Sequence, residues 1–225
     1  MAYCEVPVKI IHNFKLQERK KYLLSKLTNF TDVNFVEIEK NHPTFPFEMY
    51  SGGDEVSWRM KHLNLYTPIP NYRKLSIPEI LATASHYYAM TTFSSEWCLI
   101  LEDDALLPDD IADKINYLTL STPDKVDIIF IGGGFPINEV TFITGSLNNL
   151  FIAKPPNTNT TVAYLIRKSL SLKILINFKY FDLPIDFELA YQLHQLNALV
   201  VHSQPYLIQE GSKSVYSSSI DQYRI

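Results

Sequence analysis

The chain has 225 residues and a formal net charge of −4, and 46% of its residues are hydrophobic. This length and apolar content suit one globular domain, placed at 1–225, and exclude disorder as the main description. The negative charge leaves no basic field for a polyanion, so we expect no nucleic-acid partner. Two cysteines form neither a disulfide framework nor a zinc site, and no apolar run approaches the ~18–20 residues of a transmembrane helix. We therefore expect a soluble, cytoplasmic protein with no integral membrane segment.

The first third of the chain predicts a βαβ unit followed by an irregular segment. An apolar run at 6–12 predicts a strand, 18–27 predicts a helix and 33–38 predicts a second strand. This order favours a parallel sheet. Residues 41–75 are irregular and rich in proline, and long loops of this kind are commonly functional.

The rest of the chain alternates between short apolar runs and helical patterns. The stretch Ser76–Glu79 has the sequence of a capping box with a proline in its first turn, and predicts a helix to about Thr92. The segment 135–158 is loop-rich, and the polar tail from 212 is expected to wrap the surface or a site. The other expected elements are strands at 97–101, 126–131, 162–166, 198–201 and 206–208, and helices at 109–120, 167–177 and 186–196.

Three consecutive acids, Glu102, Asp103 and Asp104, follow the buried strand at 97–101. In a parallel sheet they would lie at the carboxyl end of the strand, where open α/β sheets bind ligands. Neighbouring carboxylates repel one another unless a cation or hydrogen-bond donors offset the charge. A hard divalent ion shared with substrate phosphates would do so. A solvated turn that caps the next helix is the alternative interpretation.

Other polar residues are weaker candidates. Asp186 follows a proline at the expected start of a helix, where it is either an N-cap or a general base. Ser85 and His86 lie among apolar residues of a helix, which is typical of core groups but also compatible with a polar pair facing a phosphate. Arg19 belongs to a basic helix that is ordinarily solvated, although an arginine there could reach a diphosphate. The glycines at 132–134 allow either a turn or a close backbone approach to a ligand.

Taken in order, these pieces resemble glycosyltransferase family 25, which contains lipooligosaccharide and collagen galactosyltransferases. Each motif alone is weak, but their order and spacing over residues 7–220 are fairly specific. The matching residues are His12-Asn13-Phe14, Arg19, Leu75 to Ile80, Ser85-His86, Leu101 to Ala105, Asp127 to Gly132, Tyr164-Leu165-Ile166, Pro184-Ile185-Asp186, Pro205, Gln209 and Ser219-Ile220. The chain departs from the family pattern at Phe14 (usually Leu), at Leu81-Ala82 (commonly Gly-Cys) and at Thr160 (often Gly).

The resemblance implies a GT-A-like fold, a single α/β/α domain with a mixed, mainly parallel central sheet. It also implies a metal-dependent inverting glycosyltransferase that moves a hexose, galactose or glucose, from a UDP-sugar to a hydroxyl of a glycan or protein acceptor. The implied cofactor is Mn²⁺ or Mg²⁺, which stabilises a leaving diphosphate. The irregular segment 41–75 is expected to form part of the acceptor site. A lipid-linked acceptor, as in lipopolysaccharide biosynthesis, would bring the chain to a membrane surface.

The acidic triplet resembles the DxD element of such enzymes. On this basis Asp104 is expected to bind the metal directly, while Glu102 or Asp103 acts through water or through the donor ribose. Glu102 is the second metal candidate and Asp103 is assigned to donor binding. The resemblance also implies a further metal ligand from the C-terminal part, for which His202 and Gln209 are both candidates.

The resemblance makes Asp186 the base that deprotonates the acceptor hydroxyl, with Glu188 as the second choice. The donor pocket is expected to include Asn13, Arg19, Ser85 and His86.

Two other functions compete with this one. A catalytically inactive module that binds a nucleotide sugar or glycan would keep the same fold, and UDP binding without transfer would distinguish it. A metal-dependent phosphoesterase is less expected, because such sites normally gather several separated Asp and His ligands.

Overall fold

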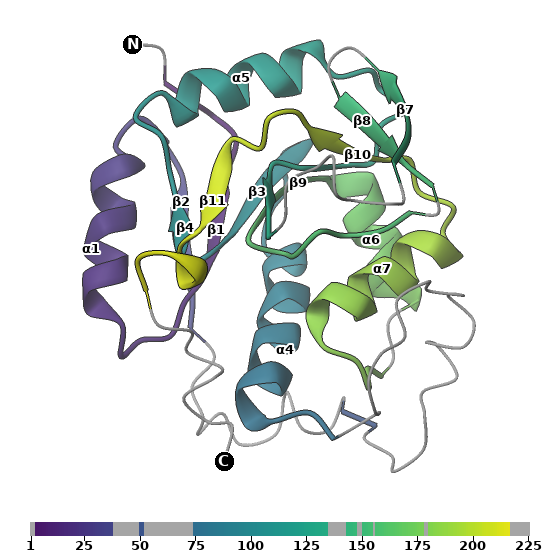
Figure 1. Cartoon of the computed structure of the whole chain (residues 1–225), viewed down its shortest axis with the longest axis horizontal. Helices are drawn as coiled ribbons and strands as arrows, with labels where there is room; N and C mark the ends of the chain where they lie inside the picture. The colour runs from purple at the N-terminus through teal and green to yellow at the C-terminus, as the bar shows by residue number, and fades with distance from the viewer. Residues whose placement is uncertain are drawn as a thin grey trace.

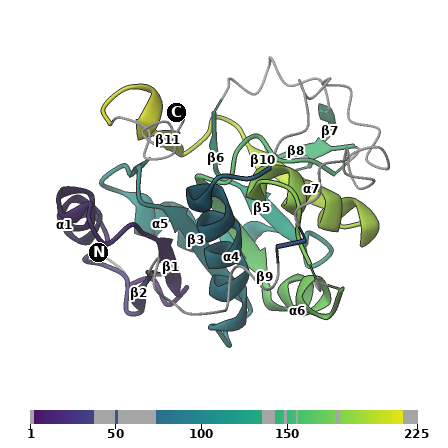
Figure 2. The same cartoon turned by 90° about the horizontal axis from the view of Figure 1, so that it is seen from below.

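The computed structural model describes residues 3–37, 50–51, 74–134, 143–147, 150–154, 156–177 and 180–216. In this part of the chain a central sheet lies between two layers of helices (Figures 1 and 2). The predicted α/β/α arrangement with a mixed sheet is confirmed. Within the described ranges, no helix has both the length and the apolar character needed to cross a bilayer.

The main sheet has eight strands in the order β2-β1-β3-β9-β5-β10-β8-β7. Most of them run in one direction: β1 is parallel to β2 and β3, and β5 is parallel to β10, while β9 lies antiparallel between β3 and β5. The strands are β1 (Val8–Ile11), β2 (Val33–Val36), β3 (Trp97–Glu102), β5 (Ile128–Phe130), β7 (Ile143–Leu147), β8 (Leu150–Ala153), β9 (Ala163–Arg167) and β10 (Val200–Ser203).

The helices divide between the two faces of the sheet. Helices α1 (Gln17–Lys26) and α5 (Ile111–Ser121) cover one face. Helices α4 (Ile77–Thr91), α6 (Lys168–Asn177) and α7 (Ile185–Gln195) cover the other. The expected capping box begins α4, because the Ser76 N–H donates to Glu79 Oε2 at 2.8 Å.

Strand alternation explains why two cores form. Successive side chains of a strand point to opposite faces, so a strand buried on both faces is apolar throughout. In β3, Cys98 and Ile100 pack into the core under α4, whereas Leu99 and Leu101 pack into the core under α1 and α5. The opening βαβ unit is also as predicted, with β1 and β2 parallel and in register from Val8 opposite Val33.

Two sequence expectations are corrected. The loop-rich segment 135–158 contains the antiparallel hairpin of β7 and β8, and this hairpin extends the sheet beyond β10. Gly132 and Gly133, expected at a turn or at a close backbone approach to a ligand, form the short strand β6 (Gly132–Gly133). A Cβ atom on Gly132 would lie 2.7 Å from a Val162 methyl group, and one on Gly133 would collide with the Tyr206 ring. The glycines therefore give room to neighbouring side chains of the chain itself.

A small second sheet brings the C-terminal segment to the acidic triplet. It has the order β4-β11-β6, where β4 is Ala105–Leu106 and β11 is Ile208–Glu210. Glu210 pairs with Ala105, which directly follows the triplet. A short 3-10 helix, η2 (Gly211–Lys213), continues from β11. The irregular segment 41–75 lies outside the described residues except for 50–51 and 74–75, and Ser219-Ile220 lies outside them altogether.

Candidate acidic site

The acidic triplet lies at the end of β3. Its side chains point in different directions because successive side chains of a strand alternate between the two faces of the sheet. Glu102 follows the side of Cys98 and Ile100 and faces α4 and α7. Asp103 follows the side of Leu99 and Leu101 and faces α1. The two acids therefore have different partners, as their hydrogen bonds confirm.

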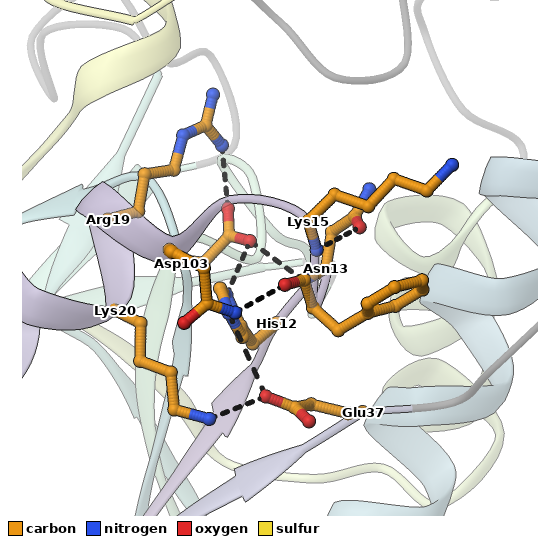
Figure 3. Close-up of polar contacts among 9 residues, drawn as sticks. His12, Asn13, Lys15, Arg19, Lys20, Glu37 and Asp103 are labelled. Carbon is orange, nitrogen blue, oxygen red and sulfur yellow. Dashed lines mark hydrogen bonds and ion pairs between the residues drawn. The ribbon is translucent and has the colours of Figure 1, made fainter.

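Asp103 is fully engaged with the first strand and helix (Figure 3). Its carboxylate accepts hydrogen bonds from His12 Nδ1 at 3.0 Å, from the Asn13 N–H at 2.9 Å and from Arg19 Nη1 at 2.6 Å. Burial alone would raise the pKa of Asp103, but these hydrogen bonds and the charge of Arg19 lower it below its usual value. The ionised Asp103 carboxylate thus links the end of β3 to the start of α1. The Arg19 guanidinium also stacks on the Tyr216 ring, 4.8 Å from its centroid.

Glu102 and Asp186 meet at a shared hydroxyl on the other face. The Thr161 hydroxyl lies 2.6 Å from Glu102 Oε1 and 3.1 Å from Asp186 Oδ1. Asp186 stands in the first turn of α7, as the sequence predicts, after Pro184 at the helix N-cap. The structure therefore brings Glu102 of the triplet close to Asp186, the predicted base.

Asp104 lies beneath the C-terminal segment. Its Oδ2 accepts the Ser212 N–H at 3.2 Å, and its backbone carbonyl accepts the Gly211 N–H at 2.8 Å. A Cβ atom on Gly211 would lie 2.5 Å from that carbonyl oxygen, so this close approach requires glycine. Asp104 Oδ1 is buried and has no hydrogen-bond partner among the described residues.

Mutual repulsion and burial raise the pKa of three carboxyl groups. Burial, followed by the charge of Glu210, raises the pKa of Glu102 to about 7, and a hydrogen bond from Thr161 opposes the shift. Burial and the charge of Glu102 raise the pKa of Asp104 to about 7. The same two causes raise the pKa of Asp186 to about 6. Glu210 acts on all three, so four carboxyl groups share one region, which we call the acidic site: Glu102, Asp104, Asp186 and Glu210.

The acidic site suits a hard cation that is shared with a ligand. The atoms that would ligate the cation are carboxylate oxygens, and one of them, the buried Asp104 Oδ1, accepts no hydrogen bond from the described residues. The raised pKa values show that the negative charge of these carboxylates is not offset by nearby positive groups in the described part of the chain. Among the described residues, however, no group of three or more His, Cys, Asp and Glu side chains is arranged to hold a metal by itself. Magnesium-type ions are commonly held by one or two carboxylates together with substrate phosphates and water. The residues present fit that mode of binding.

His86 and Ser85 have separate surroundings. His86 is fully buried, with Nδ1 hydrogen-bonded to the Tyr164 hydroxyl at 2.9 Å and Nε2 lying 3.3 Å from Glu102 Oε1. Burial lowers the pKa of His86 to about 4, so the ring is neutral near pH 7. The Ser85 hydroxyl donates to the Leu81 carbonyl within α4.

Three other predicted residues do not join the acidic site. Glu188 is fully buried and accepts hydrogen bonds from Tyr87 and from Gln192, between α4 and α7. His202 contacts the Tyr206 hydroxyl through Nδ1 and the Asn157 carbonyl through Nε2, so both ring nitrogens are engaged. Gln209 lies on β11 with an exposed side chain.

Sequence reasoning missed Thr161 and Glu210. Thr161 stands one residue before a predicted strand, and nothing in its sequence neighbourhood distinguishes it from the threonines around it. Glu210 follows the predicted strand at 206–208 by two residues, and only the pairing of β11 with β4 places it beside Asp104. The only sequence feature that could have indicated Glu210 is its position as an acid just after a predicted late strand.

A cavity of about 340 Å³ lies away from these carboxylates. It is formed by α5 and the segment after β10, and Tyr117, Leu150 and Pro205 are among its lining residues. None of the four carboxyl groups of the acidic site lines it. We place the candidate chemistry at the acidic site, because carboxyl groups with raised pKa values and the unpartnered Asp104 Oδ1 lie there.

No protein-family model matches the chain, and no curated protein matches it significantly. Among solved structures, the inositol-1-phosphate CTP transferase from T. maritima is 13% identical, with a TM-score of 0.44 over 91% of this chain and 68% of that chain. S. aureus TarS 1-349 is 14% identical, with a TM-score of 0.48 over 92% of this chain and 60% of TarS. TarS 1-349 in complex with UDP-GlcNAc is also 14% identical, with a TM-score of 0.47 over 95% of this chain and 62% of TarS. The chain thus spans about three fifths of these TarS chains, and similarity at this level assigns no activity to it.

Proposed function

We propose that the chain is a glycosyltransferase that transfers a hexose from a UDP-sugar to a hydroxyl of a glycan or protein, with inversion and with a divalent cation. The observation that carries the proposal is the acidic site, where an orphaned Asp104 oxygen lies among carboxyl groups with raised pKa values. The ordered sequence motifs that resemble glycosyltransferase family 25 support the same activity.

Asp104 and Glu102 are the residues that would hold Mn²⁺ or Mg²⁺. Glu210, rather than His202 or Gln209, is the proposed further metal ligand from the C-terminal part of the chain. When bound, such a cation neutralises the charge that develops on a leaving diphosphate. The raised pKa values favour this role, because a cation offsets the repulsion that now keeps these carboxyls partly protonated near pH 7.

Asp186 is the proposed base. A base must be ionised, close to the acceptor hydroxyl and matched in pKa to the working pH. The half-buried Asp186 has a pKa raised to about 6, so it is mostly ionised at pH 7 and still accepts a proton readily. Glu188 is a weaker choice because its carboxylate is buried between Tyr87 and Gln192.

Asp103 and Arg19 shape the donor side of the site in this proposal. Their ion pair fixes the turn at Asn13, and Arg19 is stacked on Tyr216 from the C-terminal segment. The segment 211–216 therefore lies over both the Asp103–Arg19 ion pair and Asp104.

A turnover assay tests the proposal directly. The protein is incubated with a panel of UDP-sugars and hydroxyl acceptors, with Mn²⁺ or with EDTA, and release of UDP is measured. We expect cation-dependent transfer by the wild type and its loss in Asp104→Ala. The matched control Asp113→Ala, which removes an exposed carboxylate of α5, keeps transfer. UDP binding without transfer to any acceptor would contradict catalysis and favour a binding module.

A further inference from the structure

Thr161 connects two parts of the acidic site that are far apart in the sequence, Glu102 and Asp186. Its side chain is 1% exposed, and its hydroxyl contacts Glu102 at the end of β3 and Asp186 at the start of α7. The two distances, 2.6 and 3.1 Å, are both within hydrogen-bond range. One hydroxyl oxygen thus lies between a carboxylate of the acidic triplet and the proposed base.

The loop before β9 is held against the same two acids by backbone contacts. The Glu102 N–H donates to the Val162 carbonyl at 2.9 Å. The Thr158 hydroxyl donates to the Asp186 carbonyl at 3.2 Å. The position of Thr161 between them is therefore fixed by contacts to both neighbours and does not depend on its own hydroxyl alone.

A second set of contacts ties the loop to the C-terminal half of the sheet. The Asn159 side-chain amide donates to the Tyr206 hydroxyl at 3.0 Å, and the Asn159 carbonyl accepts the Gly134 N–H at 2.9 Å. The Tyr206 hydroxyl lies 3.0 Å from His202 Nδ1. Gly133 leaves the space that the Tyr206 ring occupies.

The backbone at Thr160 is strained. Its φ angle is 82°, in the left-handed region that a β-branched residue rarely adopts. Such conformations persist where the surrounding structure overdetermines them, and they cluster at functional sites. Here the conformation turns the chain so that Asn159 reaches Tyr206 while Thr161 reaches the two carboxyl groups.

We propose that Thr161 is a positioning residue that sets the separation of the triplet and the proposed base Asp186 through its hydroxyl. This inference rests on the proposed function, because it assigns the two carboxyl groups to the two ends of one transfer reaction. The donor side and the acceptor side of the reaction would be aligned by one hydrogen-bonding oxygen, and a small misplacement of reacting groups costs a large factor in rate.

Kinetics of three variants test the positioning role. Thr161→Val keeps the shape and removes the hydroxyl, and Thr161→Ser restores it. Thr83→Val is the control, since it removes a buried hydroxyl that donates to a backbone carbonyl in α4. We expect Thr161→Val to lower kcat about tenfold or more with the donor KM changed less than about threefold, and Thr161→Ser to recover most of kcat. A Thr161→Val variant with wild-type kcat, or a Thr161→Ser variant as slow as Thr161→Val, would overturn the inference.

Crystal structures of the wild type and Thr161→Val supply a readout that needs no turnover. The Glu102 and Asp186 carboxyl groups should both be displaced in the variant, while the loop from Thr158 to Val162 keeps its backbone contacts. Unmoved carboxyl groups in the variant would overturn the positioning role. If the wild type transfers no sugar, the proposed function fails, and the two structures still decide whether Thr161 sets the separation of the two acids.

Discussion

Removing the charge of Asp104 should stabilise the protein in the absence of a divalent cation. Burial and the charge of Glu102 raise the pKa of Asp104 from 3.8 to about 7. Between these two pH values the folded state binds more protons than the unfolded state, so the free energy of unfolding falls as pH rises through this window. The loss is complete above about pH 8. Asp104→Asn removes this ionisation, and its amide oxygen can still accept the Ser212 N–H.

The magnitude follows from the linkage relation. A difference of one bound proton changes the free energy of unfolding by about 1.4 kcal/mol per pH unit. Over the interval from pH 5 to 7, the wild type should therefore lose about 2–3 kcal/mol relative to Asp104→Asn. Above about pH 8, where Asp104 is ionised in both states, the difference should stay constant.

Urea denaturation in EDTA at pH 5 and pH 8, followed by circular dichroism, measures this difference. The control Asp113→Asn removes an exposed carboxylate of α5 that lies outside the acidic site. The reasoning is refuted if Asp104→Asn is less stable than the wild type at pH 8, or if the gap between them is the same at pH 5 and pH 8.

Three further predictions concern neighbouring residues. Asp103→Asn breaks the buried pair with Arg19 and should lower the free energy of unfolding at pH 7 by about 3 kcal/mol. Because the pKa of Asp103 is lowered, this stabilisation is present above pH 4 and is lost as pH falls further. A variant as stable as the wild type in urea would contradict this prediction. Asp186→Asn should slow transfer by about 100-fold or more while Glu188→Gln stays active, and the wild-type rate should rise with pH through a midpoint near 6 and level off about one pH unit higher. A Glu188→Gln variant as slow as Asp186→Asn would reverse the assignment. Thr160→Gly should raise the free energy of unfolding by about 1 kcal/mol in the same urea assay, because glycine adopts a φ of 82° without strain, and a lower value would show that no strain is stored there.

Much of the fold follows from local patterns in the sequence. The apolar run of β3 and the capping box at Ser76 act through short-range physics, and both elements form within about two residues of where they are expected. The βαβ opening also pairs in parallel, as the strand-helix-strand order indicates. The hairpin of β7 and β8 was not expected, because its segment contains few alternating apolar residues and is defined by pairing with β10.

The candidate site was predicted less completely than the fold. Glu102 of the triplet and Asp186 do meet at Thr161, because both lie at ends of buried elements that the sequence marks clearly. The contrasting environments of Glu102 and Asp103 could not be predicted, since they depend on which element faces each side of β3. Thr161 and Glu210 enter the site only through the loop conformation at Thr160 and the pairing of β11 with β4.

The central claim is that the acidic site takes a divalent cation together with a diphosphate. Electron paramagnetic resonance of Mn²⁺, titrated with protein at pH 7.5 with and without UDP, tests it most directly. We predict that the wild type removes the free Mn²⁺ signal in the presence of UDP, and that Asp104→Asn weakens this binding about tenfold or more while Asp113→Asn does not. Equal Mn²⁺ binding by the wild type and Asp104→Asn, or none by either protein with UDP present, would contradict the claim.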